Sequence, residues 1–176
     1  MLDRIRRLLR HRWFDQATLG RVLPAAALQR LTQRVQDSER IHGGEVRIYI
    51  EAGLPNSYLL RSDDLPSLVR QRALTQFGKL RVWDTEQNNG VLIYLLLAER
   101  AIEIVADRGI DRHITPPQWQ AMLAHMREAF RQGRFEDGLN QAVDEISAHL
   151  AQHFPRPAGQ GDVNELPDAP MVGGPR

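Results

Sequence analysis

The sequence contains no cysteine, and this absence removes several kinds of chemistry. Disulfide bonds, thiolate metal sites and a cysteine nucleophile are all excluded. Long apolar runs are also missing, because the longest, residues 91–98, is far shorter than the roughly 18–20 residues that span a bilayer. The N-terminus lacks the uninterrupted apolar stretch of a signal peptide. These absences predict a soluble protein of the cytoplasm.

Established catalytic motifs are missing as well. The sequence has no GxxxxGKS/T or GxGxxG loop for phosphates, no HExxH motif for zinc, and no serine in a GxSxG context. His149 and His153 are spaced for one helix face, but such a pair is more often a coincidence than a metal site. The function must therefore be sought in the arrangement of polar loops.

What is present is the composition of one globular domain with tails: 176 residues, 42% hydrophobic and 26% charged. The charge is unevenly distributed. Residues 1–34 carry eight arginines and two aspartates, whereas the remainder is mildly acidic. Domains that bind nucleic acid place basic residues on the folded body, so no nucleic-acid partner is expected.

Residues 1–23 are predicted to form a separate basic segment, in which residues 1–14 are an amphipathic helix. Apolar residues recur there at spacings of three and four, and arginines flank them. Such a helix either packs on the protein's own core or binds a membrane surface or a membrane-protein partner. The second alternative would place the protein at the periphery of the inner membrane.

Residues 24–155 predict a single α/β domain, followed by a disordered tail over residues 156–176, which are rich in proline and glycine. Apolar residues at helical spacing, bounded by glycines and prolines, predict the helices of this domain. Capping residues support two of the starts, at residues 62–64 and at Thr115. The predicted helices cover residues 24–42, 65–77, 115–133 and 135–154.

Three strands are predicted between these helices. Glu45–Glu51 alternates strictly between apolar and polar residues, which is typical of a half-buried strand. Gly90–Asp107 predicts a hairpin whose first strand is apolar on both faces, as expected for a central strand covered by helices. The expected fold is thus a short mixed β-sheet sandwiched between helices.

The strand directions determine which loops meet. A strand–helix–strand connection favours parallel pairing of the first two strands. The short link at residues 98–100 makes the third strand antiparallel to the second. The loops at residues 42–45, 86–90 and 107–111 then lie together at one end of the sheet.

This end gathers oxygen-bearing side chains, the usual ligands of hard cations such as calcium. Asp84, Glu86 and Asn88 are spaced like the beginning of a calcium loop, although the rest of the EF-hand pattern is absent. The predicted metal ligands are Glu45, Asp84, Glu86, Asn88, Asn89 and Asp107.

Other interpretations of these residues remain open. Asn88-Asn89-Gly90 is also typical of a tight turn, and Asp107 of a cap, for backbone reasons alone. The protein would then be a purely structural interaction module. Alternatively, Asp107 and Glu86 serve a metal-dependent phosphatase in which Arg108 contacts the phosphoryl group.

Roughly residues 24–155 resemble the family of TPM-domain proteins, which is named for thylakoid-lumen, photosystem-associated and receptor-accessory members. The resemblance rests on a combination of short matches distributed over this part of the chain. They are Thr85-Glu86, residues 89–94, Glu99-Arg100, residues 103–110, Trp119, Phe130, Gly133, Phe135, Gly138-Leu139 and residues 153–155.

The resemblance implies a small α/β sandwich with helices on both faces of a short mixed sheet. It also implies three kinds of function, since some members act as acid phosphatases, some bind calcium, and many bacterial members act at membranes. The polar positions that match the family are Glu86, Asn89, Asp107 and Arg108. Many bacterial relatives carry a signal peptide and a C-terminal membrane helix, and neither pattern occurs in these residues.

Overall fold

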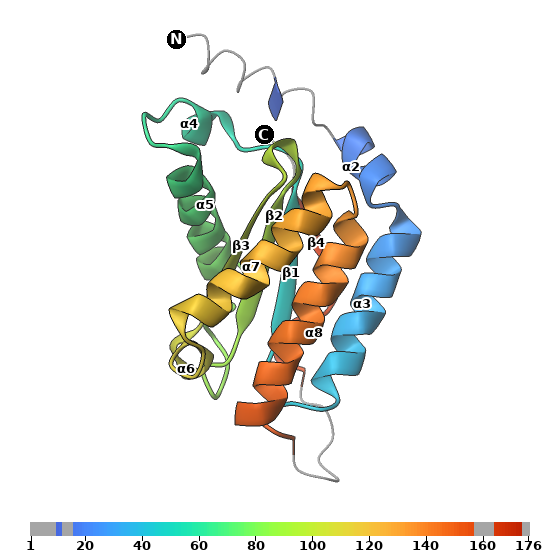
Figure 1. Ribbon diagram of the computed structural model, residues 1–176, viewed down its shortest axis with the longest axis vertical. Helices are drawn as coiled ribbons and strands as arrows, with labels where there is room; N and C mark the ends of the chain where they lie inside the picture. Colours follow the sequence, from blue (N-terminus) through green and yellow to red (C-terminus); the bar gives the residue numbers. More distant parts are fainter. Residues whose placement is uncertain (1–9, 12–15, 157–163, 174–176) are drawn as a thin grey trace.

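A computed structural model describes residues 10–11, 16–156 and 164–173 (Figure 1). Helices and strands alternate along the first two thirds of the chain, and two long helices follow. The helices and the short 3₁₀ turn η1 are α2 (Gln16–Val22), α3 (Ala25–Glu39), α4 (Asn56–Leu59), α5 (Leu65–Lys79), η1 (Leu97–Glu99), α6 (Arg108–Asp111), α7 (Pro116–Arg131) and α8 (Phe135–His153). The strands are β1 (Val46–Glu51), β2 (Val91–Leu96), β3 (Ala101–Ala106) and β4 (Met171–Gly173).

The strands form one mixed sheet in the order β3-β2-β1-β4. β1 and β2 are parallel, with Val46 opposite Val91, and β2 and β3 are antiparallel, with Val91 opposite Ala106. One face of the sheet packs against α5, and the other packs against α3, α7 and α8 (Figure 1). The predicted α/β sandwich and the predicted strand directions are therefore confirmed.

Capping side chains explain where two of the helices begin. The Asp64 side chain accepts a hydrogen bond of 3.2 Å from the Ser67 N–H at the start of α5. At the start of α7, the Thr115 N–H donates to Gln118 Oε1 at 2.8 Å, as in a capping box, and prolines follow Thr115. Both predicted helix starts are confirmed.

β1 is buried on both faces, whereas its alternating sequence predicts one exposed face. Its polar side chains are covered by α5 and by the C-terminal segment. Glu51 pairs with Arg72 of α5, and Arg47 Nη1 donates to the Ala169 carbonyl at 3.4 Å. Burial lowers the pKa of Arg47 from its ordinary value, although neighbouring carboxylates oppose this shift.

The C-terminal segment differs from the predicted disordered tail over residues 164–173. Leu166 is buried in the core on the α5 side of the sheet, and β4 pairs in parallel with β1. The Ala52 N–H donates to the Gly173 carbonyl at 3.1 Å. Proline and glycine do not prevent this course, because β4 is an edge strand of only three residues.

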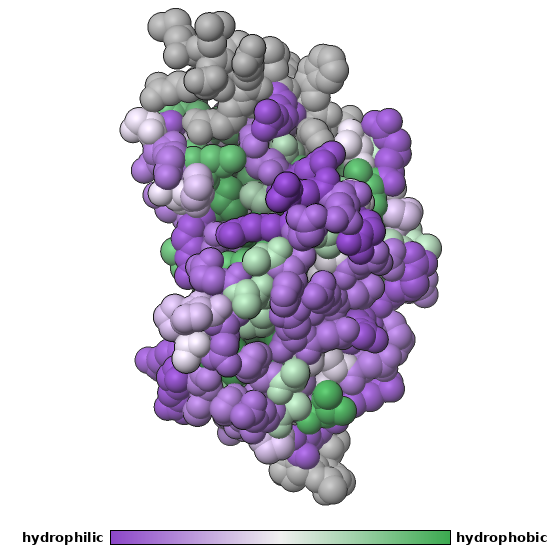
Figure 2. Space-filling model, viewed as in Figure 1, coloured by the Kyte–Doolittle hydropathy of each residue, from purple (hydrophilic) through white to green (hydrophobic). Residues whose placement is uncertain are grey.

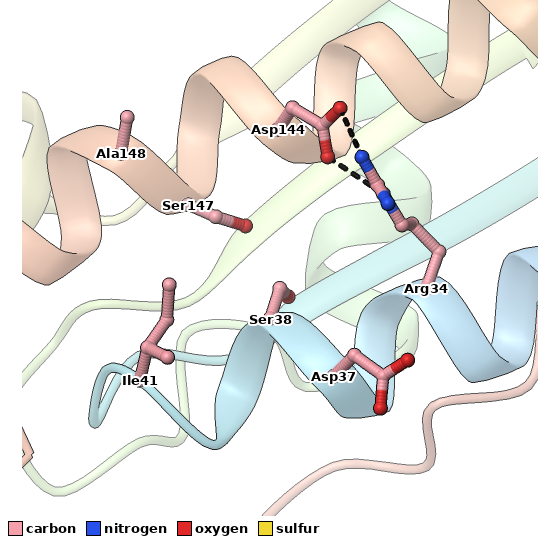
Figure 3. Close-up of a pocket in the computed structure, with 7 residues that line it drawn as sticks. All are labelled: Arg34, Asp37, Ser38, Ile41, Asp144, Ser147 and Ala148. Carbon is pink, nitrogen blue, oxygen red and sulfur yellow. Dashed lines mark hydrogen bonds and ion pairs between the residues drawn. The ribbon is translucent and has the colours of Figure 1, made fainter.

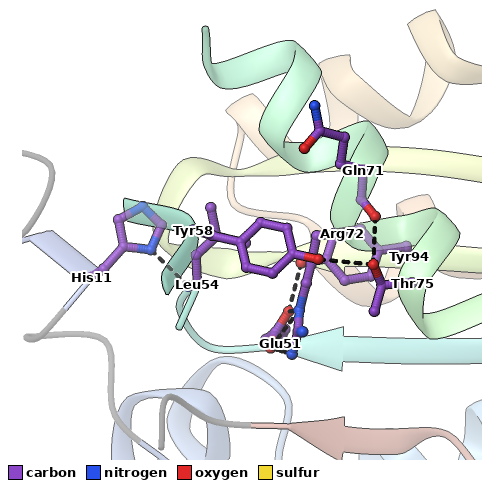
Figure 4. Close-up of polar contacts among 8 residues, drawn as sticks. All are labelled: His11, Glu51, Leu54, Tyr58, Gln71, Arg72, Thr75 and Tyr94. Atoms are coloured by element: carbon purple, nitrogen blue, oxygen red, sulfur yellow. Dashed lines mark hydrogen bonds and ion pairs between the residues drawn. The ribbon is translucent and has the colours of Figure 1, made fainter. Parts of the chain in front are cut away.

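The predicted N-terminal helix lies mostly outside the described residues, and only Arg10 and His11 of it are described. Both contact Glu99, Arg10 at 2.7 Å and His11 Nε2 at 3.0 Å. The Leu54 N–H donates to His11 Nδ1 at 2.9 Å (Figure 4). Contact of residues 1–14 with a membrane or a membrane protein stays a prediction. No helix in the described part of the chain is long and apolar enough to cross a bilayer.

Candidate functional site

The loops before β2 and after β3 meet directly, as the predicted hairpin requires. The Asp107 N–H donates to the Gly90 carbonyl at 2.9 Å, and the Gly109 N–H donates to the Asn88 carbonyl at 2.8 Å. A Cβ atom on Gly109 would lie 2.3 Å from the Asn88 carbonyl oxygen and 2.4 Å from that of Gln87. Glycine at position 109 is therefore required for this close approach.

The loop before β1 joins them at the same end of the sheet. Asn89 Nδ2 donates to the Gly43 carbonyl at 2.9 Å, and the Val91 N–H donates to the Glu45 carbonyl at 2.8 Å. Thr85 Oγ1 accepts a hydrogen bond of 3.0 Å from the Asn89 N–H. The predicted convergence of the three loops is confirmed. We call this region the loop end.

Two side-chain oxygens at the loop end are buried and accept no hydrogen bond from any described residue: Asn89 Oδ1 and Asp107 Oδ2. The other groups of the same side chains are engaged, since Asn89 Nδ2 bonds Gly43 and Asp107 Oδ1 accepts the Arg108 N–H at 2.7 Å. A buried acceptor without a donor costs about 1–3 kcal/mol. Both atoms that lack a hydrogen-bond partner are therefore acceptors, and oxygens of this kind can bind a cation.

The other predicted ligands have different surroundings. The Glu45 carboxylate accepts the N–H groups of Glu165 and Leu166, each at 3.2 Å, so the C-terminal segment uses its oxygens. Asn88 Oδ1 accepts a hydrogen bond of 3.2 Å from Arg108 Nε.

Two further carboxylates lie on the surface of this end. Asp84 is exposed and forms a loose ion pair with Arg81 at 3.8 Å. Glu86 is exposed, and its N–H donates to the Glu165 carboxylate at 3.0 Å. The described residues hold no group of three or more aspartate, glutamate or histidine side chains placed to bind a metal ion. A cation site here would therefore depend on amide and main-chain oxygens as much as on carboxylates.

A hollow of about 300 Å³ lies between α3 and α8 (Figure 3). Its polar groups are already bonded to the protein. Arg34 forms a bidentate ion pair with Asp144, while the Ser38 and Ser147 hydroxyls donate to main-chain carbonyls of their own helices. The hollow therefore adds no candidate ligand.

A buried polar cluster near the opposite end of the sheet was missed by the sequence analysis (Figure 4). Glu51, at the end of β1, is fully buried and accepts hydrogen bonds from Arg72 Nε at 2.9 Å and Arg72 Nη2 at 2.5 Å. The Tyr94 hydroxyl donates to the same carboxylate at 2.7 Å. The Arg72 guanidinium also lies 5.2 Å from the centre of the Tyr58 ring.

The pKa values of Arg72 and Tyr94 are both raised in this cluster. Burial opposes the charge of Arg72, but its hydrogen bonds to Glu51 and the charge of Glu51 outweigh burial and raise the Arg72 pKa. Burial, with the charge of Glu51, raises the Tyr94 pKa well above its ordinary value. One sequence signal existed, since Arg72 stands four residues after Leu68 on the buried face of α5.

Comparisons with known proteins agree with this architecture. The sequence model of the TPM domain matches residues 15–149. The NMR structure of the BA42 protein from the psychrophilic bacterium Bizionia argentinensis is similar, with a TM-score of 0.71 and 27% identity over 86% of this chain and 95% of that one. The N-terminal domain of a P. gingivalis protein, also solved by NMR, shares the fold, with a TM-score of 0.53 and 19% identity over 77% and 83% of the two chains.

The comparison with curated proteins gives no match. The family match nevertheless covers most of the chain, including β1, β2, β3 and all three loops of the loop end. The similar structure of the BA42 protein agrees with it. The chain belongs to the TPM-domain family.

Proposed function

We propose that this protein is a binding module that takes a hard divalent cation of the calcium class at the loop end. Asn89 Oδ1 and Asp107 Oδ2 are the two main side-chain ligands of this cation. The observation that carries the proposal is that both oxygens are buried and have no donor among the described residues. Calcium binds such mixed sets of carboxylate, amide and main-chain oxygens together with water.

The remaining predicted ligands have secondary roles in this proposal. Asp84 and Glu86 are exposed acidic residues that favour a cation electrostatically. Glu45 is the weakest of the predicted ligands, because each of its oxygens already accepts a hydrogen bond from an N–H group of residue 165 or 166. A bound cation would tie the loops before β2 and after β3 together, which is a binding role and involves no chemical step.

Calorimetric titration with calcium chloride tests this proposal. We expect saturable binding that Asp107→Asn weakens by at least about tenfold, a loss that even an outer partner of a metal ligand typically causes. Asparagine keeps an acceptor for the Arg108 N–H, so the start of α6 is preserved. Asp63→Asn removes an equal charge from an exposed position before α5 and is the matched control. No heat at millimolar calcium, or equal affinities for both variants, would reject the site.

A phosphatase is the second candidate, and one observation favours it. The Arg108 guanidinium is exposed beside Asp107 and is held by Asn88 through its Nε atom, which leaves its outer edge toward solvent. An oriented arginine near a bound cation is what phosphoryl transfer requires. The matched family model also carries phosphatase in its name.

Hydrolysis of a chromogenic phosphate monoester, with calcium, magnesium or a chelator, tests this candidate. If the protein is a phosphatase of this kind, Arg108→Ala and Asp107→Asn should each lower turnover by at least about a hundredfold, as loss of a transition-state contact typically does. Arg81→Ala, at an exposed arginine before β2, is the control. Turnover that survives Asp107→Asn would exclude this assignment without affecting the binding proposal.

A further inference from the structure

β3 is an open edge of the sheet, since it pairs with β2 and no other described strand lies beside it. The register places Gly90 opposite Asp107, and the Asp107 N–H bonds the Gly90 carbonyl. In an antiparallel pair, alternate residues direct their N–H and C=O groups to the partner strand and away from it. Ile102, Ile104 and Ala106 therefore direct their backbone groups away from β2. Ile102 is only 2% exposed, and of the three residues only Ile104 and Ala106 line the groove beside this edge.

Arg70 supports this assignment. Its Nη1 atom donates to the Ile104 carbonyl at 2.7 Å from the open side of β3, and it also contacts Glu103 at 3.3 Å. The guanidinium thus occupies the place where a neighbouring strand would offer an N–H. The open edge already accepts one external donor, at one of its outward carbonyls.

The open edge lies at the bottom of a groove between two helices. α5 and α7 pack on opposite faces of the sheet and both flank β3 (Figure 1). Hydrophobic residues reach the surface along the line between these helices (Figure 2). The groove has a volume of about 460 Å³. Its lining is mixed: the apolar residues are Ile104, Ala106, Ile114, Pro116, Trp119 and Leu123, and the polar ones are Arg70, Glu103, Asp111 and Gln120.

We propose that this edge groove binds an extended segment of a partner protein, which adds a strand to the sheet next to β3 and places an apolar side chain against Trp119. Backbone N–H and C=O groups repeated at every second residue match another strand, and a helix offers no such groups along its side. The apolar residues that line the groove contact alternate side chains of the added strand.

The position of the edge between two helices favours a single strand over a second copy of this chain. The edge is recessed between α5 and α7, so the β3 edges of two copies would have to bring these helices together. A lone extended segment has no flanking helices and meets no such obstacle. On binding, an incoming N–H replaces Arg70 at the Ile104 carbonyl, and Arg70 keeps its contact with Glu103.

The test uses the whole protein and an acetylated heptapeptide of alternating valine and threonine with a lysine at each end. Backbone NMR should give saturable shifts at the Ile104 and Ala106 amides, with slower hydrogen exchange at these positions. The same peptide with N-methyl groups on its central residues cannot pair and should produce no shifts. Equal shifts from both peptides, or shifts confined to residues elsewhere, would overturn the proposal.

Two tryptophan variants supply the matched comparison. Trp119→Ala should weaken binding of the heptapeptide by about tenfold, as loss of a buried aromatic anchor typically does. Trp83→Ala removes a tryptophan that is 50% exposed and lies outside the groove, and it should leave the affinity unchanged. Shifts of the Ile104 and Ala106 amides with protein concentration alone would show that a second copy occupies the groove, which would overturn the choice of a partner strand.

Discussion

Replacing Glu51 by alanine is expected to lower the free energy of unfolding by about 3–5 kcal/mol, the usual cost of leaving one member of a buried ion pair uncompensated. The fully buried carboxylate accepts hydrogen bonds from both Arg72 and Tyr94, so its loss leaves the guanidinium without a counter-charge and removes the acceptor of the Tyr94 hydroxyl. Urea unfolding followed by circular dichroism measures the change.

An exposed ion pair of similar geometry is the control for this prediction. Arg34 and Asp144 pair in bidentate fashion between α3 and α8, but both are about half exposed (Figure 3). Asp144→Ala should cost no more than about 1 kcal/mol. If Glu51→Ala costs equally little, the buried cluster does not stabilise the fold as described.

The double variant Glu51→Leu, Arg72→Met separates charge from packing. Replacing both partners of a buried pair by apolar residues is often neutral, because no lone charge remains. We expect it to recover most of the loss caused by Glu51→Ala. A deficit of about 1 kcal/mol should remain for the Tyr94 hydroxyl, which loses its acceptor.

Gly109→Ala is expected to lower the free energy of unfolding by about 1–3 kcal/mol, the usual cost of overpacking. The added methyl group would overlap the main-chain carbonyl oxygens of Gln87 and Asn88, and backbone atoms cannot rotate away as a side chain can. The loops before β2 and after β3 must then separate, so calcium binding should weaken in the same variant. Urea unfolding and calorimetry measure the two effects.

Gly78→Ala provides the opposite result in the same chain. Gly78 lies within α5, and nothing lies within 4 Å of a Cβ atom placed there. Alanine is preferred over glycine in a helix, so this variant should gain about 0.5–1 kcal/mol. Unchanged stability of Gly109→Ala beside a stabilised Gly78→Ala would show that the loops do not meet as closely as described.

Much of the fold could be predicted because its signals are local. The apolar run of β2, the short link to β3 and the helix between β1 and β2 determine strand direction, and strand direction brings Asn89 and Asp107 to one end. The burial of β1 could not be predicted in this way. Its polar residues resemble a solvent-facing set, and the buried Glu51 carboxylate is tolerated because Arg72 and Tyr94, 21 and 43 residues away, donate hydrogen bonds to it.

Part of the candidate site could likewise be predicted from the sequence, and part could not. Its glycines and asparagines indicated turns, and the turns lie where expected. Which oxygens are engaged was not predictable. Glu45 and Asn89 look equivalent as ligands, yet Glu45 accepts main-chain N–H groups from residues 120 and 121 positions further along the chain.

By itself, the sequence determined the α/β class, the three strand directions and the meeting of three polar loops, because periodicity, turn chemistry and chain connectivity act over short distances. Tertiary structure alone decided three features: the course of the C-terminal segment beside β1, the pairing of Glu51 with Arg72, and the two loop-end oxygens that accept no hydrogen bond from the described residues. Each depends on hydrogen-bond partners from distant segments, and those partners are chosen only when the helices and strands pack together.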